Sequence, residues 1–215
     1  MLYDKDIREP LFEYLETRFP IHRIYEEKMI GNSRADAVLV TPDALYGIEI
    51  KSDADTYARL QRQTRDYDKY YDYNIIVCGG SHGNHIREHV PEHWGIITVD
   101  EVDGKCDFYY YREPLPNPHT SIANKLSILW RPELASIQEK LGLPKYNNFG
   151  KAKLIQKIKD MATEAEYQPL ICDTLLNRDY TTIAETISAF RKEKNLKKRR
   201  YTKKLGVKRK RRSGL

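Results

Sequence analysis

GIEIKSDAD, residues 47–55, is the stretch from which the fold can be worked out. A strand built around Ile48 and Ile50 would normally exclude charge, yet Glu49 and Lys51 stand within it, two residues apart. Side chains at that spacing point to the same face of a sheet. The isoleucines can therefore fill a core on one face while the carboxylate and the ammonium lie together on the other.

The sequence around this strand predicts an α/β fold. Residues 4–18 have apolar residues at helical spacing, although Pro10 favours a helix that begins later than Asp4. Residues 21–30 are expected to be extended, and a turn at Thr41-Pro42-Asp43-Ala44 separates the next two strands. Further elements are expected as strands at 34–40, 44–51, 74–80, 94–99 and 106–111, a helix at 55–71 and a polar connection at 81–93. The order is αβββαβ with extra strands in a mixed sheet.

Beyond PLPNPH, residues 114–119, the pattern changes to helices that run to about Lys194. We expect a core over residues 1–113, a helical module over 114–194 and a disordered basic tail over 195–215. Residues 191–215 hold 14 Lys or Arg and one acid, whereas residues 1–190 hold 23 basic and 30 acidic side chains. Such a basic run stays solvated and favours polyphosphate partners through counterion release.

Cysteine usage and hydropathy indicate a cytoplasmic protein. Cys78, Cys106 and Cys172 are odd in number and widely spaced, which is typical of a reducing compartment. No apolar run approaches the roughly 18 residues of a membrane span, and the first residues do not have the pattern of a signal peptide.

The turn at Pro42-Asp43 predicts a metal site. With these two residues at its centre, cross-strand partners have numbers that sum to 85, so Asp36 falls opposite Glu49. Cross-strand Cβ atoms lie about 4.5–5.5 Å apart, and two carboxylates at that distance repel unless a cation or a proton intervenes. Mg²⁺, for which Mn²⁺ can substitute, resolves the conflict. A one-residue bulge would spoil this register.

Lys51 lies on the same strand face as Glu49, one position further along. Its ammonium can orient an attacking water and offset negative charge on a phosphate in the transition state. Taken alone, a Glu-x-Lys tripeptide is typical of a surface ion pair. With an aspartate in register and an apolar opposite face, it indicates hydrolysis of phosphodiesters.

RAD (34–36) followed by EIK (49–51) resembles the PD-(D/E)xK nuclease superfamily, with Ala35 in place of its usual proline. The stretch that follows is similar to the RecB-like branch, whose QxxxY helix motif matches Gln63 and Tyr67. The resemblance extends to a group of small bacterial and phage proteins through EIKSDADT, ARLQRQ and VPEHWGI. It implies a restriction-endonuclease-like core, with Asp36, Glu49, Lys51, Gln63 and Tyr67 as catalytic residues.

Two further sets of residues are tied to this site. An additional acidic ligand is expected at Glu27, which a two-residue Gly31-Asn32 turn would place opposite Asp36; Glu26 and Glu13 are alternatives. Glu27 could instead be an edge-strand charge that discourages aggregation. Arg59 lies one turn before Gln63 on the same helical face and is expected to contact nucleic acid.

Residues 131–161 resemble the SAP-like helix-extended-helix module that binds DNA, although the loop at 142–150 is longer than usual. Lys151 and Lys153 match its DNA-contacting positions. The alternative is a helical pair that only packs on the core. Nucleic-acid contacts are also expected from the tail, at Arg199, Arg200, Lys208, Arg209 and Lys210.

Together these features predict a Mg²⁺-dependent DNA nuclease that acts in repair, recombination, defence or phage DNA processing. The ligands would be Glu27, Asp36 and Glu49, with DNA as the partner, and cleavage of both strands would favour a homodimer. The alternative is a catalytically inactive nucleic-acid-binding or assembly protein on the same fold.

Overall fold

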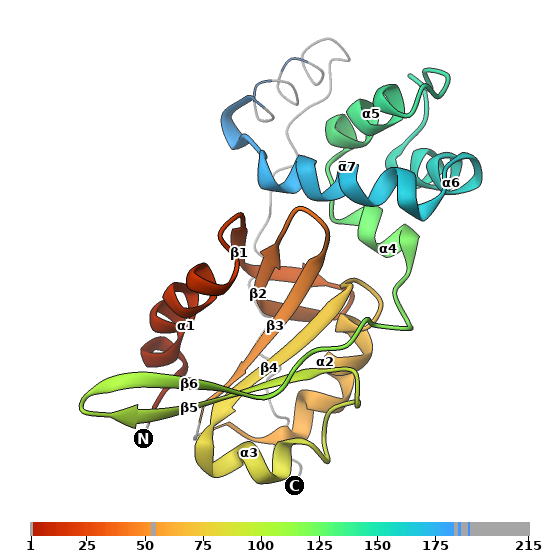
Figure 1. The fold of residues 1–215 in the computed structure, drawn as a ribbon. Coiled ribbons are helices and arrows are strands. Elements are labelled where there is room, and N and C mark those ends of the chain that lie inside the picture. Colours follow the sequence, from red (N-terminus) through yellow and green to blue (C-terminus); the bar gives the residue numbers. More distant parts are fainter. Residues whose placement is uncertain (1, 53–54, 183–184, 186–188, 190–215) are drawn as a thin grey trace, which may run out of the picture. The chain divides into compact units, whose positions relative to one another are not determined.

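The structure, a computed structural model, describes residues 2–52, 55–182, 185 and 189. The chain divides into two compact units, Met1–Arg178 and Asp179–Leu215. All helices and strands named below lie within the first unit, and Figure 1 labels them. The expected nucleic-acid contacts in the tail, from Arg199 to Lys210, lie outside the described residues. The expected boundary at residue 113 stays a prediction.

A six-stranded mixed sheet forms the centre of the first unit. Its strands lie side by side in chain order and are β1 (Arg23–Ile30), β2 (Ser33–Val40), β3 (Leu45–Lys51), β4 (Tyr73–Gly79), β5 (Gly95–Val102) and β6 (Lys105–Arg112). β4 runs parallel to β3 and to β5, and the other neighbours are antiparallel. The predicted α/β class with a mixed sheet is confirmed.

Helix α1 (Asp4–Arg18) covers one face of this sheet (Figure 1). Its buried Ile7, Leu11 and Leu15 pack with Ile48, Ile50 and other apolar residues of β2 to β5. The helix begins at Asp4 although Pro10 lies inside it. Proline cannot donate to the carbonyl four residues earlier, and the carbonyl of Asp6 instead accepts from Cys106 Sγ at 3.5 Å.

On the opposite face, a short 3₁₀ turn η1 (Tyr57–Arg59) leads into α2 (Leu60–Tyr67). This helix is shorter than the predicted 55–71. Asp68 follows it, and its carboxylate accepts hydrogen bonds from Asn74 at 3.0 Å and from the Trp94 indole at 2.8 Å. These contacts hold the end of α2 against β4 and the segment that enters β5.

Two glycines mark close approaches to the sheet. A Cβ on Gly47 would lie 2.2 Å from the Tyr71 ring and 2.7 Å from the Tyr67 ring, so only glycine lets both rings pack on β3. Residues 81–93 were expected as a connection, but they include most of a short helix, α3 (Gly80–Ile86). A Cβ on Gly83 would come within 2.8 Å of Thr98, so tertiary packing overrides its low helix propensity.

In the part of the first unit that follows the sheet, the chain forms α4 (Ile122–Ser127), α5 (Arg131–Lys140), α6 (Lys151–Met161) and α7 (Glu164–Leu176). Their buried apolar side chains belong to the same core cluster as Tyr67, Tyr71 and Trp94. Within the described residues, no helix combines the length and the apolar character that a membrane span requires.

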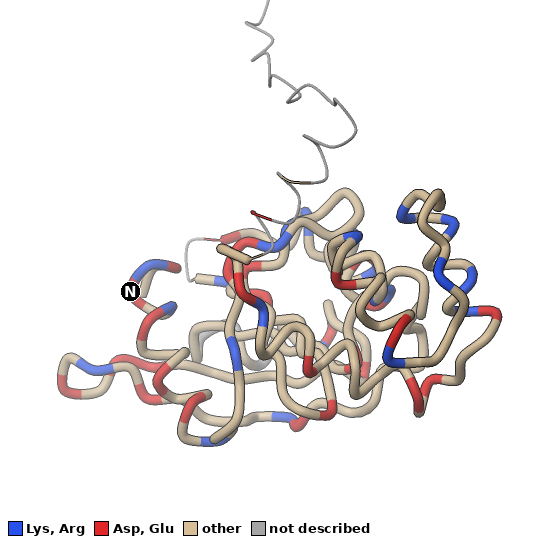
Figure 2. Tube along the Cα trace, turned by 90° about the horizontal axis from the view of Figure 1, so that it is seen from above, with Lys and Arg blue, Asp and Glu red and all other residues tan. Residues whose placement is uncertain are grey.

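Charge is distributed unevenly along the chain. Over most of the described part, basic and acidic positions are interspersed along the trace (Figure 2), whereas α6 has four lysines and one aspartate. The excess positive charge of the sequence comes from residues 191–215. Basic side chains near the sheet are therefore dispersed along the sequence and do not form a continuous run like that of residues 191–215.

Candidate active site

The β2–β3 hairpin has the predicted register. Its pairs run from Val40 with Leu45 to Ala37 with Ile48, which is a partner sum of 85, and the turn is closed by the Thr41 amide on the Ala44 carbonyl at 2.9 Å. Asp36 and Glu49 occupy the next positions of this register. The Asp36 carboxylate accepts the backbone N–H of Ile50 at 2.8 Å. The hairpin thus brings Asp36 to the end of β3 that carries the charged pair.

Glu49 and Lys51 lie on the α2 side of the sheet, and both are buried, with 1% and 5% of their surface exposed. Lys51 Nζ is 2.5 Å from Glu49 Oε1 and 3.3 Å from Gln63 Oε1. Burying charge is costly unless it is paired and hydrogen-bonded. Because the two charges pair with each other, they can be buried on the face of β3 that the sequence predicted. The isoleucines of β3 lie on the other face, against α1.

Helix α2 adds Gln63 and Tyr67, one turn apart, to the same carboxylate. Gln63 Nε2 donates to Glu49 Oε1, and the Tyr67 hydroxyl lies 2.6 Å from Glu49 Oε2. The same hydroxyl accepts the Asp36 backbone N–H at 3.2 Å. Burial and the negative charge of Glu49 raise the pKa of Tyr67 well above its ordinary value, so the phenol stays protonated and can donate. Tyr67 therefore ties both acidic residues to α2.

The electrostatics of Asp36 indicate a place for a cation. Burial and the nearby charge of Glu49 raise the pKa of Asp36 to about 7. The amide of Ile50 and the ammonium of Lys51 oppose this rise without cancelling it. Near neutral pH the two carboxylates thus conflict, and a positive ion that bound both would relieve the conflict.

These residues line a cavity of about 510 Å³. Four arginines share its lining with the acidic residues and Lys51: Arg8, Arg34, Arg59 and Arg62. Arg8 donates to the Asp36 carbonyl at 3.1 Å and to the Asp4 carboxylate at 2.9 Å, so α1 also contributes to the site. Arg59 was predicted here from its helical spacing. Asp4, Arg8, Arg34 and Arg62 were not predicted.

The candidate third acids occupy different places. The β1–β2 pairs have the predicted partner sum of 63, but Glu27 has φ +50°, and its carboxylate pairs with Arg34 at 2.9 Å. Glu26 lies 3.5 Å from Arg8, and Glu13 is exposed outside the cavity lining. Among the described residues, no three His, Cys, Asp or Glu side chains are gathered as a metal cluster. The site brings two carboxylates together, and a third ligand stays a prediction.

The two lysines of the helical module point to different environments. Lys151 is half-buried and donates to the Ser127 carbonyl at 2.6 Å, whereas Lys153 is exposed and lies 6.0 Å from the Phe149 ring centroid. Helices α5 and α6 pack into the core through Leu134, Ile137, Leu154 and Ile158. Helices α5 and α6 therefore pack on the core, and Lys153 at the start of α6 is exposed as well.

Comparison with known proteins gives a family and one distant structure. The structure of Pyrococcus furiosus SfsA in complex with Ca²⁺ is similar over 49% of this chain, with a TM-score of 0.31 and 15% identity. This chain covers 59% of that one, a little over half of its length. No curated protein matches the sequence. The sequence model of the family described as Bacteriophage P4 protein cII matches residues 2–209, nearly the whole length, and the chain belongs to that family.

Proposed function

We propose that this protein is a Mg²⁺-dependent nuclease that hydrolyses phosphodiester bonds of DNA. The observation that carries the proposal is the buried Glu49–Lys51 pair beside Asp36, at the wall of a cavity that is also lined by arginines. Two acids and an amine held this closely are expensive to bury for structural reasons alone. Their arrangement favours a reaction that needs all three.

Asp36 and Glu49 are the residues that would hold the metal ion. Both offer carboxylate oxygens, the ligands that Mg²⁺ prefers, and Mn²⁺ accepts the same set. The raised pKa of Asp36 supports this fit, because a divalent ion would stabilise the ionised forms of both groups. The chemistry that a bound ion would supply is acidification of water and polarisation of a phosphoryl oxygen.

The remaining roles belong to side chains of this chain. Lys51, once released from Glu49, can hold a water by hydrogen bonding and offset negative charge as the phosphorus–oxygen bond breaks. Gln63 and Tyr67 donate to Glu49 and fix the direction of its carboxylate. Glu27 would join the ligands only if its pair with Arg34 opened.

Arginines favour a nucleic acid as the substrate. Arg34, Arg59 and Arg62 line the cavity beside the acids, and guanidinium groups bind phosphate through two parallel hydrogen bonds. The basic residues 191–215 and the exposed Lys153 would add affinity that is independent of base sequence. Membership of a family named after a bacteriophage protein favours phage DNA processing among the candidate roles. Cleavage of both strands would favour a homodimer, which supplies a second copy of the site.

The test compares wild type with Asp36→Asn and Lys51→Met on supercoiled, linear and branched DNA in Mg²⁺ or Mn²⁺. Loss of a group that stabilises transition-state charge lowers rates by about 10²- to 10³-fold, so both variants should lose cleavage. Lys69→Met, a change at a half-exposed lysine outside the cavity, is the matched control. Cleavage that persists in both site variants rejects the site. Binding without cleavage by wild type identifies an inactive nucleic-acid-binding protein instead.

A further inference from the structure

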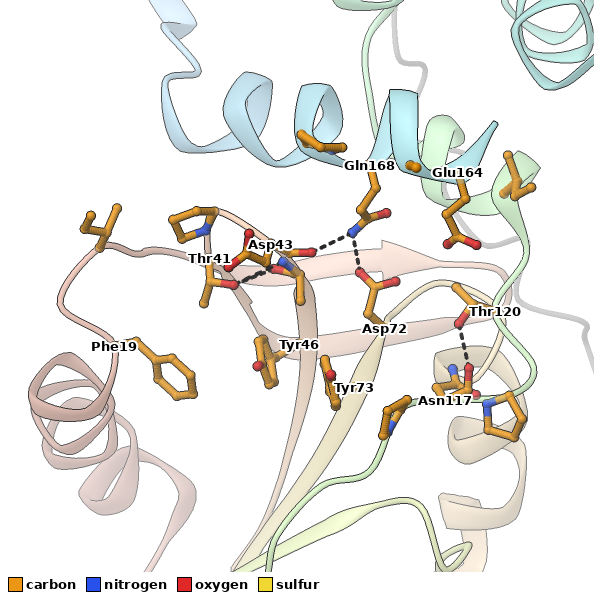
Figure 3. Close-up of a pocket in the computed structure, with 18 of the residues that line it drawn as sticks. Phe19, Thr41, Asp43, Tyr46, Asp72, Tyr73, Asn117, Thr120, Glu164 and Gln168 are labelled. Carbon is orange, nitrogen blue, oxygen red and sulfur yellow. Dashed lines mark hydrogen bonds between the residues drawn. The ribbon is translucent and has the colours of Figure 1, made fainter. Parts of the chain in front are cut away.

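A second and larger cavity, of about 1190 Å³, lies at the opposite end of β3 and β4 from Lys51. Its wall contains Tyr46 and Tyr73, which stand near the start of these two strands, and Phe19, which follows α1 (Figure 3). The β2–β3 turn and the first turns of α7 complete it. None of the residues that line it belongs to the candidate active site.

Aromatic rings form a row across this cavity. Tyr46 and Tyr73 stack with centroids 4.8 Å apart and an interplanar angle of 14°, and Phe19 lies 5.2 Å from Tyr46 on the other side (Figure 3). Prolines surround the row at positions 20, 42, 116, 118 and 169. Tyr46 thus lies between the other two rings, and Tyr73 stands at the end of the row.

The charge around this row is negative. Asp43, Asp72 and Glu164 line the cavity, and the buried ammonium of Lys125 bonds to Asp72 at 2.7 Å and to Glu164 at 2.9 Å. Arg18 also lines the cavity, but its guanidinium pairs with Glu113, which is not part of the lining, at 2.7 Å. Asp43 is exposed on the turn. The acids therefore outnumber the cations available to a ligand, which disfavours a phosphate backbone.

The floor of the cavity is held in place before any ligand arrives. The Asp72 carboxylate accepts from the Leu45 amide at 2.9 Å and from Gln168 Nε2 at 2.8 Å, in addition to Lys125. Gln168 Nε2 is also 3.2 Å from the Asp43 carbonyl, which joins α7 to the hairpin turn (Figure 3). A preformed site lowers the entropy cost of binding.

We propose that this cavity binds an extended peptide of a partner protein that carries arginine and proline. Aromatic-lined grooves take polyproline II segments, which are already ordered before binding. Guanidinium groups stack on tyrosine and pair with carboxylates, and Arg18 does both within this chain, 4.2 Å above the Tyr110 ring and paired with Glu113. Arginines of the peptide would stack on Tyr73 and pair with Asp43 and Glu164.

The test measures fluorescence anisotropy of a labelled peptide of about 12 residues with alternating arginine and proline, long enough for an extended segment. Wild type should bind it in a salt-dependent manner. Tyr73→Leu and Asp43→Lys should each weaken binding by about tenfold through lost stacking and pairing. Tyr109→Leu on β6 and Glu139→Lys on α5 change an exposed ring and an exposed acid elsewhere, and should alter binding by less than about twofold.

Four results would overturn the proposal, and three of them concern peptide binding. They are absence of binding by wild type, equal binding of a matched glutamate–proline peptide, and binding that neither cavity variant alters. Binding of oligo(dT) that is lost in Tyr73→Leu would also overturn it, because the row would then be a platform for nucleobases. Lys51→Met should bind the peptide like wild type. The peptide-binding test can therefore be interpreted even if the protein shows no nuclease activity.

Discussion

Asp36→Asn should make the metal-free protein more stable above neutral pH. A pKa of about 7 for a carboxyl whose ordinary value is 3.8 corresponds to about 4 kcal/mol of unfavourable free energy for its ionised form. Asparagine removes that charge and keeps an oxygen that can accept the Ile50 amide. Near pH 8, in the presence of EDTA, the variant should gain up to about 4 kcal/mol in free energy of unfolding.

The dependence on pH follows from the sign of the shift. Folding raises the pKa of Asp36, so the protonated carboxyl contributes to the stability of the folded protein. This contribution is fully present below about pH 3.8 and is lost as the pH rises through about 7. The stability difference between variant and wild type should therefore grow from near zero at about pH 4 to its full value near pH 8. Urea denaturation at a series of pH values measures it.

Adding Mg²⁺ should reduce this advantage. Wild type should gain about 2.7 kcal/mol at a metal concentration of 100 times Kd, whereas the variant should gain far less because it lacks one carboxylate. Asp107→Asn, at an exposed acid of β6, should change stability by no more than about 0.5 kcal/mol under either condition. A metal-free variant less stable than wild type near pH 8, or a difference that does not vary with pH, would refute the reasoning.

Three further substitutions test the surroundings of the two cavities. Tyr67→Phe removes the hydroxyl that contacts Glu49 and the Asp36 amide, and should cost about 1–3 kcal/mol in urea denaturation; an unchanged midpoint would contradict its bridging role. Gly47→Ala places a methyl group within 2.7 Å of the Tyr67 ring, so thermal denaturation should show a loss of about 1–3 kcal/mol or more. A fully stable variant would show that the rings can move aside. Lys125→Met leaves the Asp72 carboxylate without its buried cation, and should cost about 3–5 kcal/mol by the same assay; Lys140→Met, at an exposed ion pair, is its control.

Local rules were enough to predict the hairpin that carries the site. Pro42 and Asp43 set a two-residue turn, and the period of two along β3 decides which side chains share a face. The contacts of Gln63 and Tyr67 with Glu49 agree with their one-turn spacing on a helix expected after that strand. Strand register and side-chain periodicity depend on residues that are close together in the sequence, so both can be predicted from it.

Contacts between distant elements were beyond the sequence. Asp4 and Arg8 line the cavity because the start of α1 contacts β2, where Arg8 donates to the Asp36 carbonyl. Helical spacing alone does not specify this contact. The aromatic row at the other end of the strands depends likewise on where the chain turns after α1. The partner sum of the β1–β2 hairpin was predicted, but the positive φ of Glu27 and its pair with Arg34 follow from local backbone geometry that no motif encodes.

Anomalous diffraction from crystals soaked in Mn²⁺ tests most directly whether Asp36 and Glu49 form a metal site. The account predicts one strong peak within bonding distance of both carboxylates, about 2.0–2.2 Å from an oxygen of each, with Lys51 Nζ moved away from Glu49. The same soak of Asp36→Asn should lose the peak. A manganese ion bound elsewhere, or an intact Lys51–Glu49 pair with no ion beside it, would contradict the account.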